Sequence, residues 1–396
     1  MQVTQNLCIL GATGSIGCNT LNVVANHTDK FNVFALTGNA QISKLAEQII
    51  QFQPSFAVVP TERAAKALKE LLNSQANSTE ILFGKQALCD IASHEDVTTV
   101  MSAIVGAAGL MPTLAAVKSG KRVLLANKES LVMSGELFIN AVSEHGAVLI
   151  PIDSEHNAIF QCLPHDFTYA DKASSGISHL LLTASGGPFR TLPLNEFASV
   201  TPAQACAHPN WSMGQKISID SASMMNKGLE FIEAKWLFGL NEDDIKVVIH
   251  PQSTIHSMVQ YVDGSVLAQM GNPDMRTPIA HGLSYPERMT SGVQPLDFSA
   301  LHNFSFEEPC SERFPNLYLA MQASRDGQSA TTALNAANEQ AVEAFLQNKI
   351  NFLQINHVNN EVLDKMPIQN LSSLEGILAH DKHSRDIANA VIQNLC

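Results

Sequence analysis

The sequence predicts an α/β protein with an N-terminal Rossmann-like parallel sheet, a central α+β domain and a C-terminal helical bundle. Three observations support this prediction. Short apolar runs alternate with helical patterns up to about residue 150, a glycine-rich turn follows the first run, and Ala-rich helical spacing dominates the chain after residue 313. Strands that alternate with helices favour parallel pairing in a doubly wound sheet.

Six short apolar runs in the first 150 residues are the predicted strands of the parallel sheet. The fourth run begins a long uncharged stretch, Val100–Val117, which is interrupted by Gly106, Gly109 and Pro112. We therefore expect a buried strand, a turn and a helix there, not a membrane span. The six runs are Leu7–Leu10, Val33–Leu36, Ala57–Val59, Val100–Val105, Val123–Ala126 and Ala147–Ile152.

The pattern of apolar runs and helical segments changes after residue 150. Longer Ser-, Gly- and Pro-bearing loops occur up to residue 285, together with a hairpin pattern in which Met258–Val262 and Ser265–Met270 flank Asp263-Gly264. Asp-Gly favours a type I′ turn, and the hairpin face is a candidate oligomer surface. We expect domains at 1–150 and 151–285, a Pro-bearing linker at 286–312 and a helical domain at 313–396, with helical spacing in segments such as 332–347.

Composition limits the classes of partner and compartment. The chain has 396 residues, 45% of them hydrophobic, and a formal net charge of −13, which suits two or three domains and argues against nucleic acid or an anionic membrane as a partner. Seven scattered cysteines without Cys-x-x-Cys spacing indicate reduced thiols. The N-terminal sequence lacks the pattern of a secretion signal. We therefore predict a cytoplasmic protein.

Two acids follow the last predicted strand of the parallel sheet. If the chain is extended there, Asp153 and Glu155 point to the same side. Because two like charges a few Å apart raise each other's pKa, such a pair must be solvated, share a proton or bind a cation. A divalent metal site is the sharpest hypothesis, and two solvated acids in a loop are the alternative.

The glycine turn after the first predicted strand has the spacing Gly11, Gly14, Gly17 and precedes a predicted helix. Glycines allow the backbone to approach a pyrophosphate, and the helix N-terminus supplies N–H donors. A purely structural turn is the alternative. The second strand ends in 36–41, Leu-Thr-Gly-Asn-Ala-Gln, without the acid that usually binds an NAD ribose. This favours NADP, although the segment also lacks Arg or Lys for the 2′-phosphate.

Later segments carry further candidate residues. Ala126-Asn-Lys-Glu-Ser130 follows a strand, at the sheet edge where ligands of open α/β sheets bind, so we expect Lys128 to face the crevice unless this is an ordinary loop with solvated charges. Ser221, Asn226 and Lys227 near a helix start could hold a phosphate. Glu230, four residues after Asn226, could complete the metal site, with a solvated helix acid as its alternative. The predicted core face of this helix comprises Leu229, Ile232, Trp236 and Leu237.

A third pattern has the composition of an active-site lid. Gly186-Gly187 could act as a hinge for a loop near 186–214 that ends with His208, Trp211 and Met213. Trp211 and Met213 would then exclude water from the ligand, and a structural corner is the alternative. We assign mainly structural or packing roles to His250, His256, His281, Met224 and Met225.

Together these segments closely resemble the 1-deoxy-D-xylulose 5-phosphate reductoisomerase family along the length of the chain. Six separated motifs, in order, carry the resemblance. They are Gly11-Ala-Thr-Gly-Ser-Ile-Gly17, Ala126-Asn-Lys-Glu-Ser130, Asp153-Ser-Glu-His-Asn-Ala-Ile-Phe-Gln161, Ser185-Gly-Gly-Pro188, His208-Pro-Asn-Trp-Ser-Met-Gly214 and Met224-Met-Asn-Lys-Gly-Leu-Glu230.

The resemblance implies a site with three sets of residues. It implies Mg²⁺ or Mn²⁺ bound by Asp153, Glu155 and Glu230, with these acids, Lys128 and His208 as catalytic residues. It implies NADPH contacts from Thr13, Gly14, Ser15, Ile16, Asn127, Glu129 and Gly214. It implies that the phosphosugar is held by Lys128, Ser154, Glu155, Ser185, His208, Trp211, Ser221, Asn226, Lys227 and Glu230.

The activity that the resemblance implies is NADPH- and metal-dependent conversion of 1-deoxy-D-xylulose 5-phosphate to 2-C-methyl-D-erythritol 4-phosphate, by a homodimer. One departure stands out, because many family members carry a Gly-basic-Asn element where this chain has Asn39-Ala40-Gln41. The alternatives are an NADP-dependent dehydrogenase of another sugar phosphate, without a metal, and a non-catalytic dinucleotide sensor.

Overall fold

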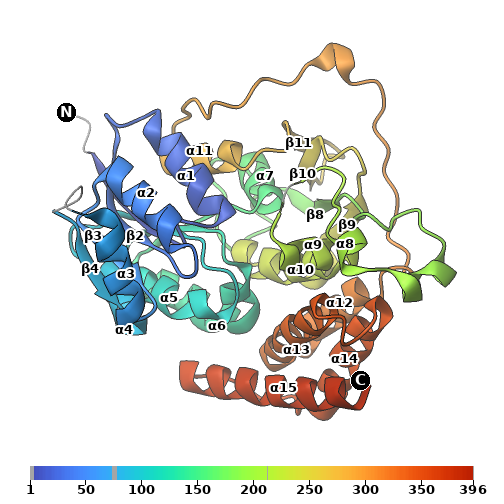
Figure 1. The fold of residues 1–396 in the computed structure, drawn as a ribbon. Coiled ribbons are helices and arrows are strands. Elements are labelled where there is room, and N and C mark those ends of the chain that lie inside the picture. Colours follow the sequence, from blue (N-terminus) through green and yellow to red (C-terminus); the bar gives the residue numbers. More distant parts are fainter. Residues whose placement is uncertain (1–3, 74–77, 212, 396) are drawn as a thin grey trace. The chain divides into compact units, whose positions relative to one another are not determined.

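The computed structural model describes residues 4–73, 78–211 and 213–395, and its elements are shown in Figure 1. The chain forms two compact units. The first comprises Met1–Ser130, Phe138–Asp153 and Asp274–Gln294, and the second comprises Leu131–Leu137, Ser154–Pro273 and Pro295–Cys396. Residues 274–294 therefore pack with the N-terminal sheet, although the sequence suggested that they divide between the central domain and the linker.

The first unit contains a seven-stranded parallel sheet of order β4-β3-β2-β1-β5-β6-β7. The parallel sheet and all six of its predicted strands are confirmed, although the strand predicted as 100–105 ends at Ser102. The strand that the sequence did not reveal is β4, whose ends are exposed. The strands are β1 (Gln5–Leu10), β2 (Phe31–Thr37), β3 (Phe56–Val59), β4 (Glu80–Phe83), β5 (Thr99–Ser102), β6 (Arg122–Leu125) and β7 (Val148–Pro151).

The central strands of this sheet are buried, as expected when helices cover a parallel sheet. Leu7–Leu10 of β1 and Thr99–Ser102 of β5 are buried at every position. The expected strand, turn and helix in 100–117 are present, with Pro112 in the first turn of α5. The helices of this unit are α1 (Ser15–Ala25), α2 (Ile42–Phe52), α3 (Glu62–Leu72), α4 (Lys85–Ala92), α5 (Leu110–Lys118), α6 (Lys128–His145) and α11 (Arg276–Ser284), with the short η1 (Ala107–Gly109).

Helix α6 is broken at Ser134, whose φ and ψ of −140° and 29° are not helical. Helix α13 (Gln328–Leu346) satisfies the backbone around the break. The Thr331 and Thr332 hydroxyls donate to the carbonyls of Val132 and Met133, at 2.8 and 2.9 Å. Because a helix interruption leaves carbonyls without their usual N–H donors, these bonds stabilise the break.

The second unit contains a four-stranded mixed sheet of order β11-β10-β8-β9. Strand β10 pairs antiparallel with β8 and β11, so the predicted hairpin is confirmed, whereas β8 and β9 are parallel. The strands are β8 (Ile177–Ala184), β9 (Ile245–Ile249), β10 (Ile255–Tyr261) and β11 (Val266–Met270).

The predicted type I′ turn of the hairpin is wrong. A type I′ turn needs positive φ at both central residues, but Gly264 has a φ of 89° whereas the φ of Asp263 is not positive. The Gly264 N–H donates to the Tyr261 carbonyl at 3.1 Å, and the Tyr261 N–H donates to the Ser265 carbonyl at 2.9 Å. The connection is therefore a longer loop in which glycine forms a bulge after the turn.

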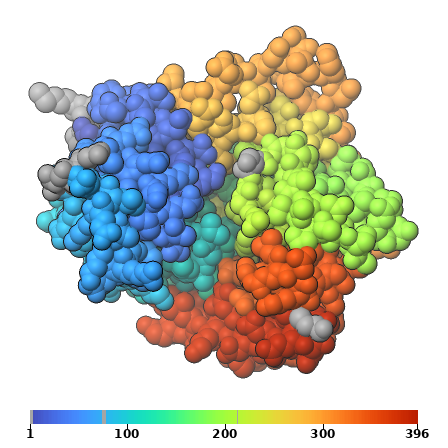
Figure 2. Space-filling view, viewed as in Figure 1, coloured from blue at the N-terminus to red at the C-terminus, as the bar shows by residue number. Residues whose placement is uncertain are grey.

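The predicted C-terminal helical bundle is confirmed and contains α12 to α15. Its core includes Phe345, Phe352 and Ile355. The stretch 286–312 is largely exposed and contains the short η4 (Phe298–Ala300) and a single bridge from Glu307 to Ile249; it is coloured orange in Figures 1 and 2. The helices of the second unit are α7 (Ser154–Cys162), α8 (Pro202–Ala205), α9 (Gln215–Ala222), α10 (Met225–Phe238), α12 (Pro315–Asp326), α13, α14 (Phe352–Lys365) and α15 (Leu374–Leu395), with η2 (Leu194–Ser199) and η3 (Glu242–Asp244).

Two general properties follow from the described part of the chain. None of its helices combines the length and the apolar character needed to cross a membrane. Its six cysteines are free thiols, and burial raises the pKa of Cys8 to about 12. The seventh cysteine, Cys396, lies outside the described residues, as does Ser212 of the predicted lid.

Candidate active site

The glycine turn of the first unit is held by close backbone contacts. Gly11 has a φ of +84°, and a Cβ added there would lie 2.6 Å from the Ala103 carbonyl oxygen. A Cβ on Gly17 would lie 2.4 Å from the Gly11 carbonyl oxygen. Gly14 is the N-cap of α1, and no described side chain caps that helix start. Gly11 and Gly17 therefore have no room for a side chain. The uncapped start of α1 is suited to bind an anion such as the pyrophosphate of a dinucleotide.

Asn127, Lys128 and Glu129 lie where β6 passes into α6. The Asn127 side chain caps α6, because its Oδ1 accepts from the Ser130 N–H at 3.0 Å, and its Nδ2 donates to Glu129 Oε2 at 3.1 Å. Lys128 Nζ forms an ion pair with Asp153 Oδ2 at 2.8 Å. Lys128 and Glu129 are both buried. This excludes the alternative of an ordinary loop with solvated charges.

The segment around Asp153 and Glu155 is not extended. Strand β7 ends at Pro151 and α7 begins at Ser154, so Asp153 precedes the helix and Glu155 lies in its first turn. The prediction that the two acids share one side of an extended chain is therefore wrong. The helical turn brings them together in a different way. The Ser154 hydroxyl donates to the Glu155 carboxylate.

The three predicted metal ligands form one group, here called the acid cluster. Asp153, Glu155 and Glu230 each offer a carboxylate oxygen, and these oxygens lie within 4.8 Å of one another. Helix α10 carries Glu230, which is 1% exposed, so the alternative of a solvated helix acid is wrong. The prediction of one apolar face on α10 is incomplete for the same reason, since α10 is buried on more than one side.

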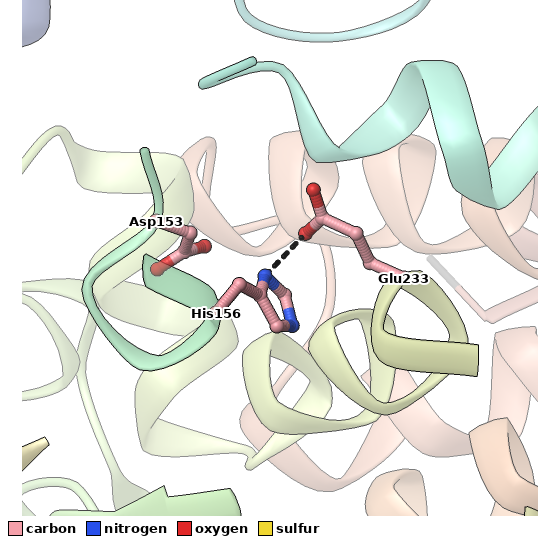
Figure 3. A group of neighbouring side chains, drawn as sticks. All are labelled: Asp153, His156 and Glu233. Carbon is pink, nitrogen blue, oxygen red and sulfur yellow. Dashed lines mark ion pairs between the residues drawn. The ribbon is translucent and has the colours of Figure 1, made fainter. Parts of the chain in front are cut away.

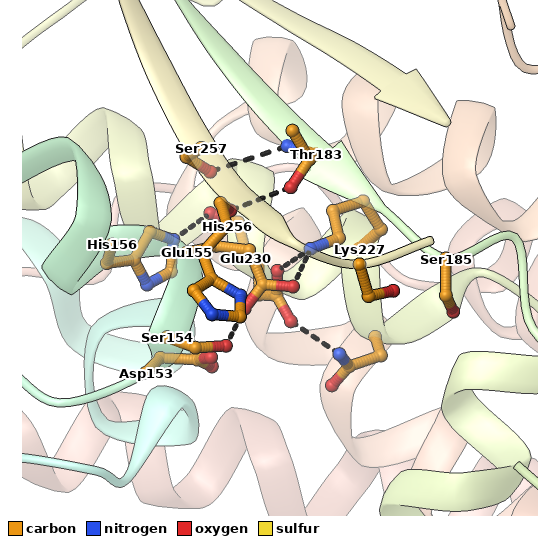
Figure 4. A network of polar contacts seen from close by, with 12 residues as sticks. Asp153, Ser154, Glu155, His156, Thr183, Ser185, Lys227, Glu230, His256 and Ser257 are labelled. Atoms are coloured by element: carbon orange, nitrogen blue, oxygen red, sulfur yellow. Dashed lines mark hydrogen bonds and ion pairs between the residues drawn. The ribbon is translucent and has the colours of Figure 1, made fainter. Parts of the chain in front are cut away.

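Lys227 compensates the charge of the acid cluster. Its Nζ lies 2.7 Å from Glu155 Oε1 and also pairs with Glu230 (Figure 4). Burial disfavours the charged ammonium, but the Glu155 and Glu230 carboxylates outweigh burial and raise the pKa of Lys227. The Asn226 amide donates to Glu230. Carboxylate oxygens in this number suit a hard divalent cation such as Mg²⁺ or Mn²⁺, so the residues fit the metal that the sequence predicted.

A second group of side chains lies beside the acid cluster and was not predicted. Asp153, His156 and Glu233 also bring ligand atoms within 4.8 Å of one another. His156 Nδ1 lies 3.1 Å from Glu233 Oε2, and both residues are buried (Figure 3). His156 Nε2 is 2.9 Å from the Glu230 carbonyl oxygen. This pair therefore supports the backbone of Glu230 and the helix that carries Glu155.

Ser185, His208 and Ser221 form the polar region next to the Gly186-Gly187 turn. Ser185 Oγ lies 3.0 Å from His208 Nε2 and accepts from the Gly187 N–H at 3.1 Å. A Cβ on Gly187 would lie 2.6 Å from the Ser221 carbonyl oxygen, so the turn packs against the end of α9. Both glycines have positive φ, 82° and 66°. Together with Lys227, these groups offer the donors that a phosphate needs.

The region predicted as a lid contains η2 and α8 and then the loop of His208 to Gly214. The N–H groups of Asn210 and Trp211 donate to His208 Nδ1, at 3.2 and 3.0 Å. Because Nδ1 accepts these two bonds, Nε2 carries the proton of the neutral ring and donates to Ser185 Oγ. Burial lowers the pKa of His208, while Glu155 acts in the opposite direction.

His256, for which the sequence predicts a mainly structural role, lies close to residues of the candidate site. Its ring centroid lies 6.0 Å from that of Trp211, and Figure 4 shows it beside Glu155. Burial lowers the pKa of His256, and the charge of Glu155 acts in the opposite direction. Nothing in the sequence around β10 distinguishes this histidine from a packing residue. By contrast, Met224 and Met225 are buried among apolar residues, as expected for packing.

The predicted site residues thus divide between the units. Thr13, Gly14, Ser15, Ile16, Asn127, Lys128 and Glu129 belong to the first unit, with Asp153 at its boundary. Gly214, the N-cap of α9, belongs to the second unit. The remaining predicted residues also belong to the second unit: Ser154, Glu155, Ser185, His208, Trp211, Ser221, Asn226, Lys227 and Glu230.

A parallel sheet with a dinucleotide-type glycine turn, on one chain with an acid cluster and a phosphate-type polar region, defines a class of nucleotide-dependent enzymes that use a divalent metal. The family model of 1-deoxy-D-xylulose 5-phosphate reductoisomerase matches residues 7–135. A model of the C-terminal domain of 1-deoxy-D-xylulose 5-phosphate reductoisomerase matches residues 149–238. A model of the DXP reductoisomerase C-terminal domain matches residues 270–387. The chain belongs to the 1-deoxy-D-xylulose 5-phosphate reductoisomerase family.

Individual relatives agree over nearly the whole chain. The 1-deoxy-D-xylulose 5-phosphate reductoisomerase of Idiomarina loihiensis is 57% identical over 393 residues, which cover 98% of this chain and 99% of the relative. That of Haemophilus ducreyi is 54% identical over 395 residues, covering 99% and 100%. The two matches leave no large segment of this chain without a counterpart.

Solved structures of similar proteins carry ligands. A DOX-P reductoisomerase crystallised with NADPH, fosmidomycin and magnesium is 50% identical, has a TM-score of 0.95 and covers 98% of each chain. The 1-deoxy-D-xylulose 5-phosphate reductoisomerase of Zymomonas mobilis, in complex with NADPH, is 46% identical with a TM-score of 0.91, covering 99% of this chain and 100% of that one. The fold predicted from the sequence is thereby confirmed.

Proposed function

We propose that this chain converts 1-deoxy-D-xylulose 5-phosphate to 2-C-methyl-D-erythritol 4-phosphate, with NADPH and Mg²⁺ or Mn²⁺, in the non-mevalonate synthesis of isoprenoid precursors. Family membership supports the reaction. The observation that carries the proposal is the acid cluster itself, three carboxylates within 4.8 Å whose charge Lys227 compensates. A dehydrogenase of simple alcohols needs no such group.

The acid cluster would hold the metal. A bound Mg²⁺ or Mn²⁺ supplies Lewis-acid chemistry toward the ketone and hydroxyl oxygens of the substrate. Lys227 and Asn226 keep the Glu230 carboxylate in place, and the Ser154 hydroxyl does so for Glu155. Lys128 holds Asp153 in the same way. These contacts orient the carboxylates before any ligand arrives, which lowers the cost of assembling the site.

The first unit would hold the cofactor at the glycine turn. NADPH, when bound, supplies the hydride that reduces the rearranged aldehyde. Thr13, Gly14, Ser15 and Ile16 form the turn and the helix start, whose backbone would approach the cofactor; the Gly14 N–H itself closes the turn by donating to the Gly11 carbonyl at 3.1 Å. Asn127 and Glu129 lie at the end of β6, the edge at which ligands of parallel sheets bind. Gly214, the N-cap of α9, is the last residue to which we assign a contact with NADPH.

The second unit would bind the phosphosugar. Ser185, His208, Ser221, Asn226 and Lys227 bind the phosphate, because they combine hydroxyl, imidazole, amide and ammonium donors. With the phosphate anchored, the carbon skeleton is held while one carbon–carbon bond breaks and another forms. Trp211 covers the ligand and excludes water, which protects the aldehyde until it is reduced.

We also assign roles to the segments of the chain. Residues 1–150 form the NADPH-binding domain, and residues 151–285 form the domain for catalysis, metal binding and dimerisation. Residues 286–312 are the linker to the C-terminal helical domain, residues 313–396. The acidic composition and the free thiols favour a cytoplasmic location.

A homodimer is favoured by the edge strand β11. Val266 and Leu267 of this strand are 44% and 51% exposed, and Val262 in the preceding loop is 75% exposed. An apolar edge strand with unpaired backbone groups is a template for pairing with another chain. Sedimentation analysis of the protein tests this assignment, and a monomer at micromolar concentration would contradict it.

The experiment that tests the proposed reaction follows NADPH oxidation with 1-deoxy-D-xylulose 5-phosphate as the only substrate, with Mn²⁺ or Mg²⁺ and again with EDTA. We expect turnover with either metal and none with EDTA. Turnover that survives EDTA would contradict the metal site, and no turnover in any condition would favour a dehydrogenase of another sugar phosphate or a sensor. NADPH binding without turnover of any sugar phosphate would favour a sensor, but neither alternative explains the acid cluster.

A further inference from the structure

The segment that follows β2 presents a question of charge. In Rossmann-like folds the adenosine ribose lies beside the end of the second strand, where an acid selects NAD and a nearby cation accommodates the 2′-phosphate of NADP. In this chain residues 38–41 are Gly-Asn-Ala-Gln. They contain no acid that would repel a phosphate and no cation that would bind it. A cation must therefore come from elsewhere if the 2′-phosphate is to be recognised.

Lys44 lies three residues further on, in the first turn of α2. Its Nζ donates to the carbonyl oxygen of Thr13 at 3.1 Å, and Gln41 Nε2 donates to the same oxygen at 3.4 Å. The two loops are also in van der Waals range, since a Cβ on Gly38 would lie 3.3 Å from Thr13 Cγ2. The ammonium is thus placed between the glycine turn and the segment after β2, where the adenosine ribose is expected.

Among the described residues, no carboxylate pairs with the charge of Lys44. The first turn of α2 contains no acid, and none of the described carboxylates forms an ion pair with Lys44. Lys44 is half-buried, so its position is more restricted than that of a solvated lysine. An ammonium has three donors, and the Thr13 carbonyl uses one of them. Two donors remain for an anion.

We infer that Lys44 is the residue through which this chain recognises the 2′-phosphate of NADPH, with the Gln41 amide as a second donor. Lysine binds phosphate as a point charge, and the bond to Thr13 positions that charge beside the cofactor turn. Lys44 and Gln41 would together replace the basic residue that is absent from 39–41. This inference rests on the proposed function, because it presumes that the glycine turn binds NADPH.

A binding experiment separates the 2′-phosphate from the rest of the nucleotide. Adenosine 2′,5′-bisphosphate and adenosine 5′-monophosphate are titrated by calorimetry into the wild-type protein and into Lys44→Met. We expect the variant to bind the bisphosphate about 10- to 100-fold more weakly, the value of a hydrogen bond to a charged group, and to bind the monophosphate unchanged. Lys44→Arg should retain most of the preference. In steady-state assays Lys44→Met should raise KM for NADPH and leave kcat unchanged.

Lys66→Met is the matched control. Lys66 lies on α3 of the same unit, is 73% exposed in its side chain and pairs with Glu62, so its loss should not change either affinity. Equal weakening of both nucleotides by Lys44→Met, or a preference that Lys44→Met and Lys44→Gln both retain, would overturn the role of Lys44. A wild-type protein that binds neither nucleotide would instead contradict the proposed NADPH site, and the inference with it.

Discussion

The glycine turn and the acid cluster represent two ways to build a candidate binding site. The turn uses backbone, since Gly11 and Gly17 are required by contacts to main-chain atoms. The acid cluster uses side-chain charges, and Lys227 balances two of its three carboxylates. A backbone site depends on the absence of side chains, whereas a charged site depends on the exact pairing of those that are present.

Buried bases show the same contrast. Burial disfavours the charged form of Lys227, yet Glu155 and Glu230 outweigh it and its pKa is raised. His281 lies on α11 of the first unit. Its burial and the positive charge of Arg288 lower its pKa to about 4. A buried base therefore stays charged only where carboxylates surround it. The difference teaches that the acid cluster is an electrostatic unit, so the loss of one member affects the others.

The largest expected effect comes from breaking the charged site. Glu230→Gln removes one carboxylate of the acid cluster and one partner of Lys227. We expect kcat/KM to fall by at least about a thousandfold, while NADPH affinity, measured by fluorescence titration, stays nearly unchanged. Glu361→Gln is the control, because Glu361 pairs only with Lys365 at the surface in the described structure. Full activity of Glu230→Gln would refute the metal site.

The next effect comes from breaking the backbone site. In Gly17→Ala the new Cβ would lie 2.4 Å from the Gly11 oxygen and 2.5 Å from the Ala12 Cα, and neither backbone atom can move freely. We expect a loss of about 3 kcal/mol in the free energy of unfolding in urea and weaker NADPH binding. Gly146→Ala is the control, since Gly146 has a φ of +63° but no atom within 4 Å of the added Cβ. It should cost only about 1 kcal/mol; equal losses would contradict the steric explanation.

The smallest effect sharpens the comparison of the buried bases. The folded protein holds the pKa of His281 at about 4, below its ordinary 6.5, so the unfolded chain takes up the proton first as the pH falls. The stabilisation is fully present above the ordinary value and is lost as the pH falls toward the folded value. Between about pH 7 and pH 5 we expect a loss of about 2 kcal/mol, measured by urea unfolding. His281→Gln should reduce this pH dependence; an unchanged slope would show that His281 does not cause it.

Much of the fold could be predicted because its signals are local. The apolar runs of the parallel sheet and the glycine turn depend on residues that are neighbours in sequence, and both are present. Strand β4 was missed because only two of its four residues are even half-buried. The hairpin was correct in pairing but wrong in turn type, because Asp-Gly suits more than one turn and Asp263 keeps a negative φ.

The candidate site was predictable only in part. Three of its acids could be chosen from two separate segments. The local geometry predicted for Asp153 and Glu155 was wrong, because a helix starts at Ser154 instead of the chain staying extended. The pair of His156 and Glu233 could not be found, since no local pattern relates residues 77 positions apart. The contact of His256 with Trp211 could not be predicted for the same reason. Trp211 comes from a distant loop.

The route of the chain through its two units has a consequence for dissecting the molecule. The chain passes from one unit to the other after residues 130, 137, 153, 273 and 294. No single cut can therefore release either unit whole. A fragment of residues 1–150 would lack α11, whose Gly282 lies against Leu124 and Ile150 of β6 and β7, and its sheet would expose apolar surface. Each unit is assembled from three separate stretches of the chain, so neither could be exchanged with that of another protein by a single splice.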